Sequence, residues 1–119
     1  MRVKVYFNLH KKMFSVVALS GPNKNRVIAH TNSLMLRDTK FRVQSAGRQK
    51  VLKEKKKNVH AFVYGYITEE ASRNLDLNRV TYNPYKYNSF VIKESECPIY
   101  ESNFVRLNVE SQIPFMFAE

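Results

Sequence analysis

The chain has 119 residues with a formal net charge of +10, and 44% of its residues are hydrophobic. Length and apolar content predict one folded domain, residues 1–119, and exclude a disordered chain, which combines high charge with low hydrophobicity. The one cysteine, Cys97, excludes an internal disulfide, so folding does not depend on an oxidising compartment. We see no signal peptide and no apolar run of membrane-spanning length, which predicts a soluble intracellular protein without a membrane partner.

The charge is divided unevenly along the chain. Residues 1–68 carry 15 Lys and Arg against two acids, which gives a net charge of +13. Residues 69–119 carry five Lys and Arg against eight acids, which gives a net charge of −3. Charge segregated in this way predicts one surface that attracts anionic partners, beyond the solubility that net charge alone provides.

Alternating apolar and polar residues predict strands in the first half of the chain. Arg2–Leu9 and Met13–Leu19 are expected to pair as a hairpin across a short turn. Shorter strands are expected at residues 26–30, 33–36 and 40–43. Val59–Ile67 has apolar residues on both of its faces, which is typical of a central strand packed on both sides.

In the second half, strands are expected at residues 79–82, 89–93 and 103–109. The apolar tail Ile113–Phe117 is expected to dock on the domain. Ala46–Lys57 is the principal helix candidate, with Ser45 as its N-cap and Asn58 at its end. The sequence therefore predicts an α+β fold: a mainly antiparallel β-sheet or partly open barrel with one principal basic helix at about residues 46–57.

Lysine and arginine are densest between Arg37 and Asn58, where nine of them stand against two acids. On the predicted helix, Lys50, Lys53 and Lys57 share one face, and a phosphate backbone would relieve their mutual repulsion. This pattern predicts a polyanion-binding surface; the alternative is a solvated face that only aids solubility. The candidate residues are Arg42, Arg48, Lys50, Lys53, Lys55, Lys56 and Lys57, supported by Lys11, Lys12 and Lys40.

Aromatic residues offer a second candidate feature, because rings beside cations on a sheet stack bases in several RNA-binding modules. One face of the predicted central strand carries His60, Phe62, Tyr64 and Tyr66. We favour the interpretation that these four rings belong to the core. The candidates for exposed stacking, for which a packed loop is the alternative, are Tyr82, Tyr85 and Tyr87.

The sequence offers no catalytic or metal-binding constellation. The histidines His10, His30 and His60 are scattered, without acids or cysteines at metal-ligand spacing. We therefore expect no enzyme activity, no metal and no cofactor. Cleavage of RNA by histidine and lysine alone is the enzymatic alternative.

Five segments of the chain resemble small proteins encoded by tailed bacteriophages. They are Val5–Lys12, Arg26–His30, Ala46–Leu52, Lys57–Val63 and Val80–Tyr87. The resemblance covers most of the chain and weakens after about Val91. It departs at residues 64–66, where that family is expected to have a plainer Val-Gly. The resemblance implies a phage origin and brings no activity with it.

These observations lead us to expect a phage-encoded accessory protein that binds DNA or RNA without catalysing a reaction, in the cytoplasm of the host bacterium. Phosphate contacts from the basic helix and its flanking strands would dominate the affinity. The first alternative is a protein-binding inhibitor, or a host-takeover or anti-defence factor, that acts on an acidic host protein or ribonucleoprotein, because the same lysines would steer that association. The second alternative is a minor virion protein.

Overall fold

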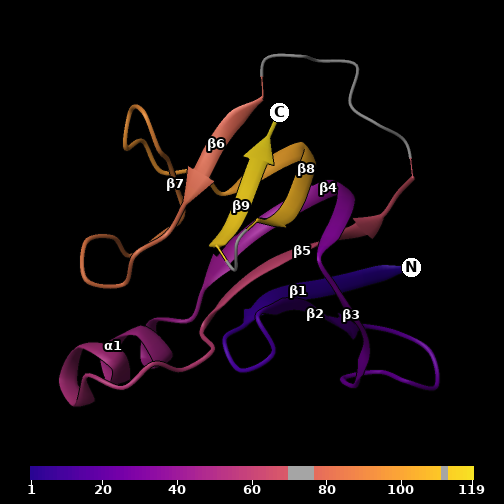
Figure 1. The fold of residues 1–119 in the computed structure, drawn as a ribbon, viewed down its shortest axis with the longest axis horizontal. Helices are drawn as coiled ribbons and strands as arrows, with labels where there is room; N and C mark the ends of the chain where they lie inside the picture. Colours follow the sequence, from indigo (N-terminus) through magenta and orange to yellow (C-terminus); the bar gives the residue numbers. More distant parts are fainter. Residues whose placement is uncertain (70–76, 111–112) are drawn as a thin grey trace.

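A computed structural model describes residues 1–69, 77–110 and 113–119, and in these ranges it shows one antiparallel sheet and one helix (Figure 1). The strands in chain order are β1 Arg2–Asn8, β2 Met13–Ala18, β3 Val27–Thr31, β4 Ser33–Val43, β5 Ala61–Ile67, β6 Asn78–Thr81, β7 Val91–Ile92, β8 Glu101–Glu110 and β9 Ile113–Ala118. The helix α1, Ser45–Glu54, connects β4 to β5. The strand order across the sheet is β3-β2-β1-β5-β4-β8-β9-β6-β7.

The sheet is open, because β3 and β7 lie at its two ends and do not pair with each other. It curls so that side chains of distant strands meet in one core, whereas α1 contributes a single buried residue, Val51. The prediction of an α+β fold, or of a partly open barrel with one principal helix, is therefore wrong: the fold is an open antiparallel sheet with one short helix. Because the sheet covers its own apolar face, it needs neither a helical layer nor closure. In the part of the chain that the structure describes, no helix has the length and apolar character that a membrane crossing needs.

Strand alternation gives the sheet an inner and an outer face. The inner face carries the apolar core, in which Val5 of β1 pairs with Val63 of β5 and Leu36 of β4 is fully buried. The outer face carries the alternate residues, such as Lys4 of β1, which lies opposite Tyr64 of β5. Each strand in the middle of the sheet therefore presents one set of side chains to the core and the other set outward.

Most of the predicted strands are confirmed. The β1–β2 hairpin forms, β5 is central between β1 and β4, and the C-terminal tail docks as β9 between β8 and β6. Residues 33–36 and 40–43 form one strand instead of two, because an irregularity between Arg37 and Lys40, with Asp38 at a φ of 50°, lets β4 continue through it. The bulge leaves Phe41 on the inner face, where it is buried.

The helix differs from its prediction at both ends. Gln44 is the N-cap and makes no side-chain capping bond, so the expected cap by Ser45 is wrong; Ser45 is already the first helical residue. At the other end, Lys55 adopts a left-handed conformation with a φ of 56°, and its backbone N–H donates to the carbonyl oxygen of Val51. This bond satisfies a carbonyl of the last turn, and the left-handed backbone at Lys55 ends the helix there.

The early stop changes where the lysines lie. Lys57 is outside the helix and does not share a helical face with Lys50 and Lys53, so the predicted row of three is wrong. A longer helix would place Lys57 one turn from Lys53, where the two like charges would repel each other. The chain instead leaves the helix and returns to the start of β5 at Ala61.

Candidate nucleic-acid interface

Basic side chains from three separate segments gather at one end of the sheet, which we name the basic end. The β1–β2 turn, the end of β4 and the start of β5 lie together there, because β1 and β4 both run antiparallel to β5. Helix α1 follows β4 at this end, and the segment after α1 leads back to β5 (Figure 1). The basic end consists of Lys11, Lys12, Arg42, Lys50, Lys53, Lys55, Lys56 and Lys57, all of them exposed.

Helix α1 packs against His60, the residue before β5, and this contact fixes the position of the helix. Leu9 of the β1–β2 turn, Val51 of α1 and Lys57 line one groove of about 560 Å³. Gly47 allows the helix to approach closely, because a Cβ at this position would lie 2.5 Å from the Cβ of His60. The lysines of α1 are therefore carried on an element that is held by the sheet.

His60 organises the hydrogen bonds at this contact, and its side chain is only 5% exposed. Its Nδ1 faces two acceptors, the backbone oxygen of Asn58 at 3.1 Å and the Oδ1 of the same residue at 3.0 Å, so Nδ1 carries the proton. Its Nε2 therefore accepts from the hydroxyl of Tyr82, 2.7 Å away. Asn58 in turn donates from Nδ2 to the carbonyl oxygen of Gly47. The interpretation of His60 as a core residue is confirmed.

Arg48 is engaged by the protein itself. Its Nε donates to the carbonyl oxygens of Pro84, at 3.0 Å, and Tyr87, at 2.8 Å, which ties α1 to the loop after β6. The side chain is half-buried, unlike the neighbouring lysines. Because its bonding partners lie 36 and 39 residues away, no local pattern indicates this role. We therefore leave Arg48 out of the basic end.

The three tyrosines predicted as stacking candidates have different surroundings. Tyr82 is half-buried at His60, and burial raises the pKa of its hydroxyl. Tyr87 donates a hydrogen bond to Glu96, and this bond raises the pKa of Tyr87 and lowers the pKa of Glu96. Tyr85 is 59% exposed, so of the three it has the most accessible ring.

Acids of the described residues do not neutralise the basic end. The ion pairs in those ranges are Arg37–Asp38, at 2.9 Å, and Lys86–Glu96, at 3.4 Å. No cation of the basic end takes part in either pair, although Glu54 lies on the same helix as two of them. Their positive charge is therefore left to attract an anionic partner.

Sequence reasoning missed a second set of cations beside the rings of β5. They are Arg2, Lys4 and Arg37, which lie on the outer face of β1 and β4. All three rings lie on the outer face, where Phe62 is buried, as expected, at 7% exposed, but Tyr64 and Tyr66 are only half-buried. Placing those two tyrosines in the core was wrong. The cations of β1 and β4 and the rings of β5 were each visible in the sequence of their own strand, but the register that joins the strands was not.

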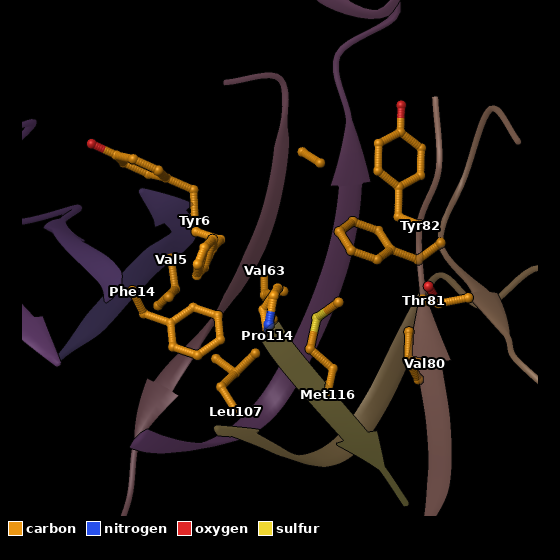
Figure 2. Close-up of a pocket in the computed structure, with 13 residues that line it drawn as sticks. Val5, Tyr6, Phe14, Val63, Val80, Thr81, Tyr82, Leu107, Pro114 and Met116 are labelled. Carbon is orange, nitrogen blue, oxygen red and sulfur yellow. The ribbon is translucent and has the colours of Figure 1, made fainter. Parts of the chain in front are cut away.

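The inner face holds an apolar hollow of about 190 Å³. Figure 2 shows Phe14, Leu107 and Met116 directed toward it, while the ring of Tyr6 points away, on the other face of β1. Its walls are mostly apolar, so it offers packing space rather than chemistry for an anion. Within residues 1–69, 77–110 and 113–119, no three His, Cys, Asp or Glu side chains lie together in a way that would hold a metal ion.

Comparison with known proteins shows which protein family the chain belongs to. The family described as the Mycobacterium phage L5 gene 82 protein matches residues 1–113. The chain belongs to this family. The gene 82 protein of Mycobacterium phage L5 is 35% identical over 113 residues, which cover 90% of this chain and 90% of that protein. The predicted resemblance to small phage-encoded proteins is thus confirmed, and both the basic end and β5 lie within the region matched to the L5 gene 82 family. No solved structure matches the chain.

Proposed function

We propose that this phage protein binds nucleic acid without catalysing a reaction, in the cytoplasm of the host bacterium. The observation that carries the proposal is the basic end, where three segments place exposed cations that join no ion pair of the described residues. Nucleic acid suits this surface because its phosphates recur closely, at one charge per roughly 1.7 Å of axis in duplex DNA.

Two physical effects favour this partner. Each lysine that contacts a phosphate displaces a condensed counterion, and the release of counterions drives binding. Lys50 and Lys53 stand three residues apart on α1, so they repel each other when no anion is present. An anionic backbone that crosses the basic end would relieve this repulsion while the helix stays in place.

A charge-reversal experiment tests the proposal. The triple variant Lys50→Glu, Lys53→Glu and Lys57→Glu is compared with wild type for binding a fluorescein-labelled oligonucleotide by anisotropy, over a series of salt concentrations. Affinity is expected to fall, and the slope of log K against log salt to decrease by about 1 for each lysine that contacts phosphate. A control with the same change in net charge alters three exposed cations outside the basic end: Lys24→Glu, Arg26→Glu and Lys93→Glu.

Comparison of the two triple variants shows whether binding depends on the basic end or only on the net charge of the protein. Unchanged binding by the basic-end variant, or equal losses in both variants, would contradict the proposal. Affinity purification from infected cells, with and without nuclease, tests the alternative of an acidic host protein or ribonucleoprotein. If wild type binds no oligonucleotide but keeps a stoichiometric host protein after nuclease treatment, and the basic-end variant loses that protein, the protein-binding alternative replaces the proposal.

A further inference from the structure

On the outer face of β1, β5 and β4, cations and aromatic rings alternate across neighbouring strands. Lys4 of β1 and Lys40 of β4 lie opposite Tyr64 of β5, one on each side. The other outward rings of β5 have similar neighbours: Arg2 and Arg37 lie opposite Tyr66, and Arg42 lies opposite Phe62. Because Arg42 also belongs to the basic end, the outer face and the basic end form one continuous surface.

Three of these cations rest on the rings. The Cζ of Arg2 is 5.6 Å from the ring centre of Tyr64, the Nζ of Lys4 is 4.9 Å from that of Phe62, and the Cζ of Arg37 is 4.9 Å from that of Tyr66. Cation–ring contacts are weak where water reaches them. A phosphate can therefore draw such a cation away and leave the face of the ring open.

The same pattern continues on the far side of β4. Arg106 of β8 lies over Phe117 of β9, with its Cζ 4.8 Å from the ring centre, and Arg79 of β6 lies opposite the same ring from the other side. Acids also lie on this surface: Asp38 pairs with Arg37 at 2.9 Å, and Glu101 of β8 lies opposite Lys40. Glu119 lines the same hollow as these two acids. Cations and rings thus extend from β1 to β6 across the sheet.

We propose that this outer face binds single-stranded nucleic acid, with bases stacked on Tyr64 and Tyr66 and phosphates held by the flanking cations. The inference rests on the proposed function and names its substrate class. On binding, contacts with the nucleic acid replace the cation–ring contacts. The cations move from the rings to the phosphates, and the bases stack on the ring faces that become exposed. Both tyrosines are half-buried, so each ring is fixed at one side and accessible at the other.

A duplex cannot use this surface in the same way. Its bases are already stacked on one another, and its major groove, about 12 Å wide, admits a helix or a two-stranded ribbon. Strands lie about 4.8 Å apart, so the run from β1 to β6 is wider than that groove. A duplex would therefore contact only the cations, and only a single strand would gain from the rings.

Paired variants of the full chain test the inference. Tyr64→Leu with Tyr66→Leu removes both rings, and Tyr64→Phe with Tyr66→Phe keeps them as a matched control. The probes are a fluorescein-labelled oligothymidine and a labelled duplex of equal length. The leucine variant is expected to lose between about 5-fold and 100-fold in affinity for the oligothymidine, with less than about 2-fold change for the duplex. The phenylalanine variant is expected to stay close to wild type with both probes.

Wild-type protein provides a second measurement that does not depend on the variants folding. The chain has no tryptophan, so its emission comes from tyrosine. Unlabelled oligothymidine is expected to quench this emission more strongly than the duplex at equal occupancy. Equal quenching by both probes, or equal losses for both probes in the leucine variant, would overturn the inference while leaving the proposed function standing. Failure of wild type to bind either probe at low salt would instead refute the proposed function, and the inference with it.

Discussion

The inner and outer faces of the sheet are built by the same strands, yet their large side chains contact different partners. On the inner face, Val63 of β5 and Leu107 of β8 are buried in the core that the curled sheet encloses. On the outer face, Tyr64 and Tyr66 follow Val63 on the same strand but lie beside arginines. Large apolar residues on both sides of a strand therefore do not by themselves indicate a strand packed between two layers.

The largest expected effect tests whether only the inner face is a packing surface. Leu107→Ala removes a fully buried side chain and is expected to lower the free energy of unfolding by about 2–5 kcal/mol, measured by urea denaturation. Tyr66→Leu on the outer face is expected to lower it by less than about 1 kcal/mol, because a half-buried ring loses little more than its contact with Arg37. Equal losses of unfolding free energy in the two variants would show that both faces are packed alike, which would contradict the difference between them.

The second prediction tests whether α1, which carries part of the basic end, is packed as tightly against the sheet as the side chains of the inner face are packed against one another. Ala in place of Gly within a helix ordinarily stabilises by about 0.5–1 kcal/mol. Gly47→Ala is expected to do the opposite and cost about 1–3 kcal/mol, because its Cβ would meet the Cβ of His60 at 2.5 Å. Gln49→Ala, at an exposed position of the same helix, is the control and is expected to change stability by less than about 0.5 kcal/mol. A stabilised Gly47→Ala variant would show that α1 is not held against His60.

The smallest effect concerns the hydrogen bond that joins the loop after β6 to His60. Tyr82→Phe removes the donor to Nε2 and is expected to lower the free energy of unfolding by about 1 kcal/mol at neutral pH. Burial raises the pKa of Tyr82 above its ordinary 10.0, so above that pH the unfolded chain ionises this group while the folded protein keeps it neutral. Its stabilisation is therefore complete below about pH 10 and is lost as the pH rises through the higher pKa of the folded state.

Urea denaturation of both proteins from neutral to alkaline pH measures this dependence. The difference in stability between wild type and the Tyr82→Phe variant is expected to narrow above about pH 10, because the variant has no hydroxyl to ionise. A difference that stays constant through this range would contradict the assignment of the pKa shift to Tyr82.

Local patterns in the sequence were enough to predict the strands but not the architecture. The alternation in β1 and β2 indicates a hairpin, and the run at β5 indicates a central strand, because side-chain periodicity is a property of each segment alone. The bulge at Asp38 was not predicted, since a left-handed backbone at an aspartate has no fixed sequence signal. The end of α1 was misplaced for the same reason, because Lys55 takes the left-handed position that glycine more often fills.

The candidate site was predicted only in part, because the basic end and the outer face of β1, β5 and β4 depend on different kinds of contact. The lysines of the basic end follow one another in the chain, so their density was visible. The pairing of Lys4 with Tyr64, across more than 50 positions of sequence, depends on the register between β1 and β5. Arg48 resembled the surrounding cations in sequence and differed only in its distant carbonyl partners.

The position of β9 has a consequence for how the protein is made. This strand comes last in the sequence but lies inside the sheet, with β8 on one side and β6 on the other. A ribosome delivers the chain from the N-terminus, so β1 to β5 and β8 can pair while synthesis continues. Among the strands that the structure describes, the β6–β7 pair has none to join until Ile113–Ala118 has emerged. Emergence of these residues is therefore the event that completes the sheet, and with it the outer surface on which Arg79 lies.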